Sequence, residues 1–293
     1  MKKIFYIFIF LLYSNLNFAQ TKSKQTPNEN QPIVLGITDK LKSTELGETR
    51  TINIYLPQGY NKKDTLKYPV IYILDGGVEE DFIHITGIVR FNTEEWIARF
   101  PKSIVVGIEN TNRRRDFTFS VPNLDFVEKM GFKKQNFPQY GGSEKYIAFL
   151  EKELQPYIDK KFNTSNHKTV IGESLAGLLA TEILLKHRNL FDNYIIIAPS
   201  LWWGDQSLLT EAPKLLKAKE NKPALVYIAA CDKDEDKTMY DVAMSLSETL
   251  KQNDEKNTKV YYDYIQNEIH STVMHQAVYN GFKAFYPKSI YQK

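Results

Sequence analysis

Short apolar runs of strand length alternate with longer amphipathic segments from residue 33 onward. Seven runs rich in Val, Ile and Tyr have the length and composition of β-strands, and they span residues 51–56, 70–74, 104–108, 169–171, 194–198, 224–229 and 260–265. Several of them are apolar throughout, as expected for strands that are buried on both faces of a sheet. The pattern therefore predicts a mostly parallel central sheet.

Segments with helical periodicity lie between these runs, and they span residues 94–100, 144–162, 175–187, 208–219, 239–252 and 272–285. In the second of them, Tyr146, Ile147, Leu150 and Leu154 recur at three- and four-residue spacing and form one apolar stripe. Strands that alternate with helices in this way are typical of an α/β fold with helices on both faces of the sheet.

Residues 117–142 do not follow the alternation. The segment is irregular and aromatic, contains Pro122 and Pro138, and lies between a predicted strand and a long predicted helix. Loops of this length in compact domains are usually functional or disordered, and the Phe and Tyr content argues against disorder. We expect a flap over a functional site, with an irregular packing loop as the alternative.

The N-terminus has the three-part pattern of a cleavable export signal. Lys2 and Lys3 precede an apolar stretch at residues 4–13, and a small residue, Ala19, ends the predicted signal at residues 1–19. The apolar stretch is too short to span a bilayer as a helix, so we expect no stable membrane span after cleavage and a periplasmic or secreted product. Residues 20–32 are polar and predict a flexible leader, and residues 33–293 then form one domain.

Charge and cysteine content exclude several classes of protein. The formal net charge is +3, and removal of Lys2 and Lys3 with the signal lowers it to +1, so nothing indicates a nucleic-acid partner. Cys231 is the single cysteine, which excludes an internal disulfide.

The sharpest local motif is Gly-Glu-Ser-Leu-Ala-Gly at residues 172–177, where a short apolar strand runs into an apolar helix. This strand, turn and helix context is that of a nucleophile elbow, in which Ser174 would be the nucleophile. The usual pattern has glycine two positions after the serine, whereas here that position is Ala176 and Gly177 follows it. An ordinary helix N-cap is the alternative interpretation of Ser174.

His270 is the best placed of the histidines to act as a general base. In elbow hydrolases the chain order is serine, acid, histidine, and the last two lie on loops after later strands. His270 follows the predicted strand at residues 260–265, and a neutral imidazole there could take the serine proton. The alternative is a cap for the helix that begins near Ser271.

Four carboxylates crowd the loop after the predicted strand at residues 224–229, namely Asp232, Asp234, Glu235 and Asp236. We favour Asp234 as the acid that orients His270, with Asp232 as the second choice. The alternatives are a solvated charged loop and a calcium loop, although the spacing and the lack of a following glycine do not match the helix-loop-helix calcium motif. We expect no metal.

An oxyanion hole needs backbone amides directed at the developing negative charge. The amide of Leu175, directly after Ser174, would supply one. The second would come from Gly77 or Val78, in the turn after the predicted strand at residues 70–74, with a plain tight turn as the alternative.

The chain resembles the putative esterase family of α/β-hydrolases, the group that includes enterochelin and salmochelin esterases. The resemblance is carried by the motifs at residues 50–57, 74–77, 106–116, 140–143, 172–177, 199–203 and 270–271. It implies an α/β-hydrolase fold without a bound cofactor, with Ser174 and His270 matching the nucleophile and base, and it leaves the acid open.

Two further sets of residues are candidates for substrate binding. By analogy with the family, Arg113 and Arg115 could face an anionic or catechol-bearing substrate, and a solvated run with internal ion pairs is the alternative. Trp202 and Trp203 follow the predicted strand at residues 194–198, at the edge where ligands bind in open α/β sheets. They would wall an acyl or aryl pocket, or else serve packing.

These features together predict a serine carboxylic-ester hydrolase that forms an acyl-enzyme. Its partner would be a small-molecule ester, such as a siderophore lactone, an aryl ester or an acyl sugar. An acyltransferase, a serine peptidase of the same fold and a non-catalytic binding module are the alternatives, because the fold alone does not decide between them.

Overall fold

The computed structural model describes residues 30, 32–217 and 222–288, and its helices and strands belong to one unit, residues 35–293. The predicted export signal at residues 1–19 lies outside the described residues, as does most of the predicted leader at residues 20–32. Of the helices that the structure describes, none combines the length and the apolar character needed to cross a membrane.

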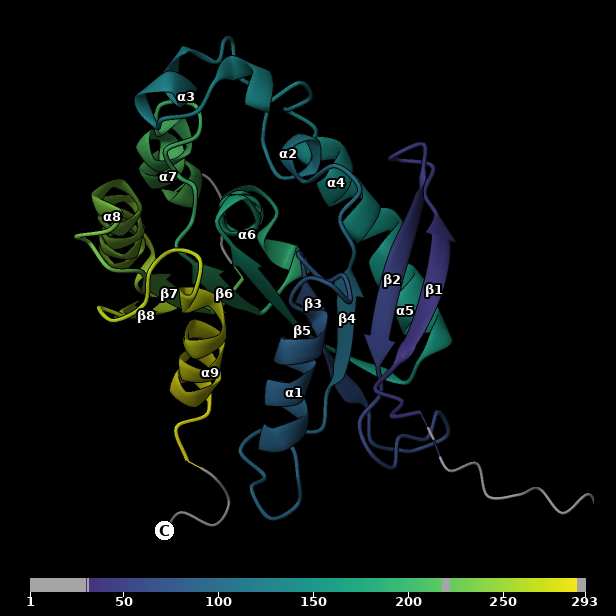
Figure 1. Cartoon of the computed structure of the whole chain (residues 1–293). Helices are drawn as coiled ribbons and strands as arrows, with labels where there is room; N and C mark the ends of the chain where they lie inside the picture. Colours follow the sequence, from purple (N-terminus) through teal and green to yellow (C-terminus); the bar gives the residue numbers. More distant parts are fainter. Residues whose placement is uncertain (1–29, 31, 218–221, 289–293) are drawn as a thin grey trace, which may run out of the picture. The chain divides into compact units, whose positions relative to one another are not determined.

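The described residues form an eight-stranded sheet, whose strands are β1 (Ile37–Lys42), β2 (Thr49–Tyr55), β3 (Tyr68–Ile73), β4 (Ile104–Ile108), β5 (Thr164–Glu173), β6 (Asn193–Ile197), β7 (Ala224–Ala230) and β8 (Thr258–Tyr264). Their order across the sheet is β1-β2-β4-β3-β5-β6-β7-β8 (Figure 1). The pairs β1 with β2 and β2 with β4 are antiparallel, and all the others are parallel. The carboxyl ends of β3 to β8 therefore meet at one edge, where ligands bind in open α/β sheets.

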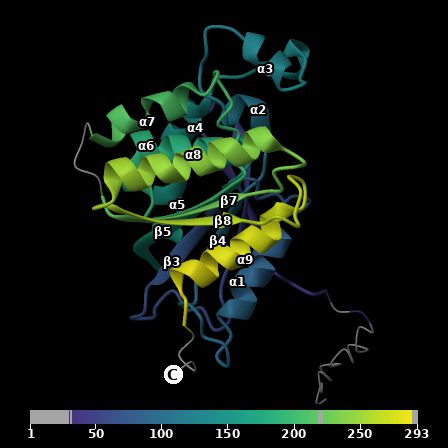
Figure 2. The same ribbon diagram turned by 90° about the vertical axis from the view of Figure 1, so that its left-hand side faces the viewer.

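The α-helices are α1 (Phe82–Asn92), α2 (Arg113–Asp116), α3 (Asp125–Lys129), α4 (Ser143–Phe149), α5 (Gln155–Lys161), α6 (Leu175–Lys186), α7 (Ser207–Lys217), α8 (Lys237–Asp254) and α9 (Val273–Phe285). Short 3₁₀ turns, η1 (Lys134–Asn136) and η3 (Arg188–Leu190), and a π-helical turn, η2 (Leu150–Leu154), complete the set in the described part of the chain. Helices α1 and α9 pack together on one face of the sheet, and α6, α7 and α8 cover the other (Figure 2).

Burial follows position in the sheet. Every residue of β4 and β6 is buried, because helices cover both faces of the central strands. The edge strands differ: β1 alternates exposed with half-buried residues, and most of β8 is half-buried.

All seven predicted strands overlap observed ones, and the predicted helices at 175–187, 208–219, 239–252 and 272–285 correspond to α6, α7, α8 and α9. The predicted helix at residues 144–162 is present as α4, η2 and α5, with the π-helical turn in its middle. The edge strand β1 was missed because its alternating residues are largely polar and bury little apolar surface.

The predicted helix at residues 94–100 is wrong, since the helix in this region is α1 and it ends before Thr93. The Thr93 hydroxyl and backbone N–H both donate to the carbonyls of Val89 and Arg90, and they satisfy the last turn of α1. The chain then continues through turns. A signal for α1 was available in the spacing of Phe82, Ile85 and Val89, which are buried.

Candidate active site

Ser174 forms the sharp turn between β5 and α6. Its φ of +57° lies in a region that residues with a Cβ atom rarely adopt. Three backbone hydrogen bonds hold this conformation: Ser174 N–H donates to the carbonyl of Ile197 over 3.0 Å, and the Ser174 carbonyl accepts from the amides of Leu178 and Ser200, each over 2.9 Å. Unusual backbone that is fixed in this way is characteristic of functional sites.

Two glycines allow the close packing around this turn. A Cβ atom on Gly172 would lie 2.5 Å from the carbonyl oxygen of Ala176, and one on Gly177 would lie 3.0 Å from Cα of Pro199. Ala176 is itself buried, and its own Cβ is accommodated because residue 172 has none. The glycine displaced by one position from the usual motif is therefore required by contact with the chain after β6.

The side chain of Ser174 contacts Ser200, with the two Oγ atoms 3.2 Å apart. Ser200 is buried and follows β6, the next parallel strand. Ser200 was not predicted as a site residue, although a small polar residue shortly after the neighbouring parallel strand β6 was an available signal. Among the described residues, Ser174 Oγ makes no hydrogen bond to His270.

His270 lies on the loop between β8 and α9, half-buried, at the same edge of the sheet as Ser174. Its backbone N–H donates to Oε2 of Glu235 over 3.1 Å, and its Nδ1 is buried without a hydrogen-bond partner within the described chain. Burial lowers the pKa of His270 below its ordinary value, an effect that Asp236 and Glu235 oppose and Arg113 adds to. The imidazole is therefore neutral at pH 7, as a general base must be.

The four loop carboxylates differ in their surroundings. Asp234, the acid favoured from the sequence, is exposed, and its N–H donates to Oδ1 of Asp232 over 2.9 Å. Asp236 is half-buried and caps α8 by accepting from Met239 N–H over 3.0 Å. The carboxylates whose charge acts on the pKa of His270 are Asp236 and Glu235. In the described part of the chain, neither Asp232 nor Asp234 makes a hydrogen bond or ion pair with His270.

A second charged group lies beside the elbow. The Arg113 guanidinium binds both carboxylate oxygens of Asp75, at 2.6 and 3.0 Å, and also donates to the carbonyl of Glu173 over 3.0 Å. Burial, with the charges of Asp75 and Asp81, raises the pKa of Glu173 to about 8 despite the opposing effect of Arg113. Arg113 therefore connects the residue before the nucleophile with the surroundings of His270, whose pKa it also lowers.

The backbone amides that could form the oxyanion hole differ in their surroundings. Leu175 is the first residue of α6, so its N–H is one of the amides that the helix itself leaves without an acceptor. Gly77 N–H is engaged, because it donates to Oε2 of Glu80 over 2.6 Å. Val78 follows it and is 44% exposed. The neighbouring Gly76 is required by close packing, since a Cβ atom there would lie 2.2 Å from the backbone nitrogen of Ile108.

Arg115, Trp202 and Trp203 have extensive internal contacts. Arg115 forms ion pairs with Glu48 and Asp116, at 2.8 and 2.6 Å. The two tryptophans are buried beneath segment 117–142: Trp202 stacks on Phe132, and Trp203 Nε1 donates to the carbonyl of Phe119 over 2.9 Å. These contacts give all three residues a packing role, and their role toward a substrate stays a prediction.

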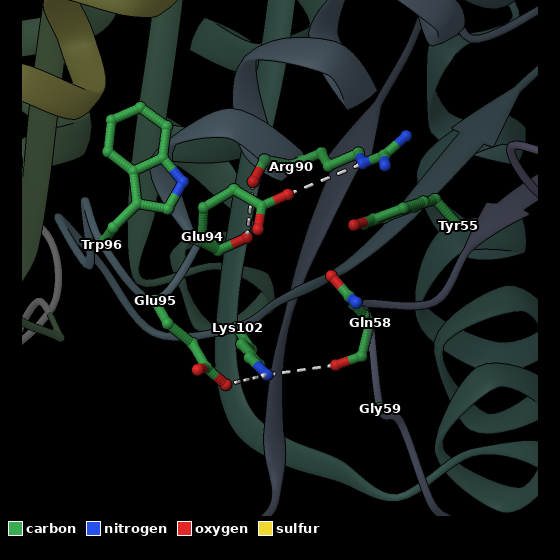
Figure 3. Close-up of a pocket in the computed structure, with 9 residues that line it drawn as sticks. Tyr55, Gln58, Gly59, Arg90, Glu94, Glu95, Trp96 and Lys102 are labelled. Atoms are coloured by element: carbon green, nitrogen blue, oxygen red, sulfur yellow. Dashed lines mark hydrogen bonds and ion pairs between the residues drawn. The ribbon is translucent and has the colours of Figure 1, made fainter.

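A hollow of about 410 Å³ lies away from this constellation (Figure 3). It is lined by Tyr55 at the end of β2 and by Arg90 at the end of α1. Tyr55 pairs with Val105, near the start of β4, so the hollow lies toward the amino edge of the parallel strands, opposite to Ser174.

Comparison with known proteins identifies the family to which this chain belongs. The family model described as putative esterase matches residues 43–285. The ferri-bacillibactin esterase BesA of Bacillus subtilis (strain 168) is 26% identical over 270 residues, which cover 87% of this chain and 91% of that protein. The structure of an IroE-like serine hydrolase from Shewanella oneidensis is 29% identical with a TM-score of 0.78, over 86% of this chain and 80% of that one. The BES protein from Bacillus cereus is 28% identical with a TM-score of 0.74, over 87% and 98%.

The match extends over the whole sheet from β2 to β8 and includes the elbow and the loop of His270. The mostly parallel sheet with helices on both faces is an α/β-hydrolase fold, as expected from the sequence. The chain belongs to the putative esterase family and is a hydrolase of ester bonds.

Proposed function

We propose that this chain cleaves carboxylic esters through an acyl-enzyme on Ser174. The observation that carries the proposal is the conformation of Ser174, which is held at a φ of +57° by three backbone hydrogen bonds at the carboxyl edge of the sheet. An ordinary helix cap needs neither this conformation nor the glycine packing around it. A turn of this kind exposes a serine hydroxyl to a substrate carbonyl.

His270 is proposed as the general base. Its neutral imidazole would take the proton of Ser174 as Oγ attacks the ester carbonyl, and would return it to the leaving alcohol. Water would then attack the acyl-enzyme with the same base. Leu175 N–H and Val78 N–H are the proposed oxyanion donors, because Gly77 N–H already binds Glu80.

The carboxylate that orients His270 is proposed from residues 232–236. The sequence favours Asp234, whereas the charge of Asp236 acts on the pKa of His270, which supports Asp236. One oxygen of Asp236 caps α8, and no hydrogen bond of the other is found within the described chain. Glu235 holds the backbone of His270 and is proposed as a positioning residue.

Siderophore esters are the proposed substrate class, because one relative, which is 26% identical over 87% of this chain, is a ferri-bacillibactin esterase. Arg113 would contribute a positive charge beside the elbow, with Asp75 fixing its direction. Residues 117–142 are proposed as the flap over the site, with their aromatic side chains covering Trp202 and Trp203. The N-terminal signal pattern supports export to the periplasm or the medium.

The test is hydrolysis of a short-chain p-nitrophenyl ester and of a ferric siderophore lactone by the protein, compared with Ser174→Ala and His270→Ala. Both variants should lose about 10⁶-fold in kcat while they keep the wild-type circular dichroism spectrum. Ser200→Ala is the matched control, because it removes the other hydroxyl of the pair, and it should cost far less. Unchanged turnover in folded Ser174→Ala would overturn the proposal.

A further inference from the structure

A second cavity, of about 730 Å³, lies at the base of segment 117–142. Its walls are the two stems of this segment, residues 119–122 and 141–144, together with the C-terminal part of α6 and the start of α7. A volume of this size is within the range that small-molecule sites occupy. None of its lining residues belongs to the proposed catalytic machinery.

Two buried polar atoms in the wall lack partners in the described chain. Glu182 is 4% exposed; its Oε1 accepts from Lys186 Nζ over 2.9 Å, but its Oε2 accepts from nothing. Ser143 is 1% exposed and its Oγ is also without a partner. Buried polar atoms in proteins are almost always hydrogen-bonded, because an unmade bond costs the full desolvation of the group. A carboxylate oxygen can only accept, so its missing partner must be a donor.

The charge of the wall indicates what kind of donor fits. Glu182 lies in the wall, and Glu144 and Glu211 are exposed at the rim, so three carboxylates line the cavity. They face one ammonium group, that of Lys186, and the ring of His187. Lys186 is already engaged by Glu182 and lies 5.3 Å from the ring centre of Phe119. The lining therefore favours a positively charged ligand.

The hollow in Figure 3 differs from this cavity in the pairing of its charges. It also contains two carboxylates, but each has a cationic partner: Arg90 lies 3.8 Å from Glu94, and Lys102 lies 3.7 Å from Glu95. Lys102 Nζ also donates to the carbonyl of Gln58 over 3.1 Å. Its charges balance, and its lining contains none of the buried unpartnered atoms.

We propose that the cavity at the base of segment 117–142 binds a small aliphatic amine, whose ammonium group donates to Glu182 Oε2 and Ser143 Oγ. An ammonium group has three donors and no acceptor, which matches two unpaired acceptors within an acidic wall. The carboxylates at the rim, Glu144 and Glu211, would take the second ammonium of a diamine. Since the ligand would touch both stems of the segment and α6, whose first turn follows Ser174, its binding would also restrain the segment.

Calorimetric titration of the full chain with putrescine tests the proposal, with the butanediol of the same chain length as the neutral probe. Putrescine should bind at one site per chain, and the diol should not bind. Glu182→Gln should weaken binding at least about tenfold, and Ser143→Ala should weaken it by a smaller factor without disturbing Lys186. Glu94→Gln, in the other hollow, is the matched control and should bind as the wild type does.

Absence of saturable binding by the wild type would overturn the proposal, and so would equal weakening by Glu94→Gln, which would show general attraction to acidic surface. Thermal melting with and without putrescine gives a second measurement should Glu182→Gln lose stability. Putrescine should raise the melting temperature of the wild type and of Glu94→Gln, but less that of folded Ser143→Ala. Equal stabilisation of all three would likewise overturn it.

Discussion

The two halves of the proposed catalytic pair are held in different ways. Ser174 lies where β5 meets α6, in a turn fixed by backbone bonds to the chain after β6 and by contacts that tolerate no Cβ atom on Gly172. His270 lies on a loop, where its backbone N–H donates to Glu235 and its Nδ1 has no partner in the described chain. The nucleophile is thus fixed by the sheet and the base by a surface loop.

This difference has a consequence for catalysis. The elbow is preorganised before substrate arrives, whereas the hydrogen bonds of the imidazole would be completed on binding. Changes near Ser174 should therefore act through packing, and changes near His270 should act through charge and orientation.

The largest effect is expected from the acid that orients His270. Asp236→Asn should lower kcat about 10⁴-fold, because the imidazole would lose its orientation and the charge that stabilises its protonated form. Asparagine remains a good N-cap, so α8 should be retained, which circular dichroism will verify. Asp234→Asn is the matched variant on the same loop and should be nearly silent. A large loss in Asp234→Asn with little in Asp236→Asn would restore the assignment made from the sequence.

The next largest effect is expected from a substitution in the elbow. Gly172→Ala places a Cβ atom 2.5 Å from the carbonyl oxygen of Ala176, so the turn must shift, and kcat should fall about 10²-fold. The control is Gly87→Ala, because residue 87 lies inside α1 and an added Cβ would meet no atom within 4 Å apart from those of its own stretch of helix. That variant should keep full activity and gain about 0.5–1 kcal/mol in the free energy of unfolding, measured in urea. Full activity in Gly172→Ala would show that the elbow is less constrained than described.

Arg113 and Arg115 should have different roles. Arg113→Gln should raise KM several-fold for a negatively charged ester and hardly for a neutral one, since Arg113 lies beside the elbow. Arg115→Gln should leave both KM values unchanged and lower the melting temperature, because Arg115 is bound to Glu48 and Asp116. Equal effects of Arg113→Gln on charged and neutral esters would remove Arg113 from the substrate site.

The smallest effect concerns pH. Because burial lowers the pKa of His270, kcat/KM should be lost on acidification with a midpoint below pH 6.5, where the imidazole becomes protonated. Arg113 adds to the lowering, so Arg113→Gln should move this midpoint to higher pH by a fraction of a unit. A midpoint above 6.5 in the wild type would contradict the described environment of His270.

Much of the fold could be predicted from sequence because the central strands and helices carry strong apolar patterns. The strands β3, β4 and β6 are buried nearly throughout, and their Val and Ile content alone identifies them. The edge strand β1 was not predicted because its residues bury little apolar surface. The predicted helix at 94–100 is wrong because the helix in this region is α1, which ends at Asn92, where the hydrogen bonds of Thr93 satisfy its last turn.

The elbow of the candidate site was equally predictable, since a strand, a serine between small residues and a helix are contiguous in sequence. The surroundings of His270 were not, because they depend on contacts between distant segments. Asp75 and Arg113, for example, are 38 positions apart, and their pairing fixes a charge that no local pattern reveals. The same holds for the pairing of Arg115 with Glu48.

The aromatic packing beneath segment 117–142 provides a spectroscopic handle. The chain has three tryptophans; Trp202 and Trp203 are 6% and 0% exposed against this segment, and Trp96 is 68% exposed beside the hollow at the other edge of the sheet. Replacement of Trp96 by Phe would leave tryptophan fluorescence that comes only from the two indoles in contact with the segment. If the proposed flap lifts and water reaches the two rings, emission from that variant would shift to longer wavelength, so that opening could be followed in real time during turnover.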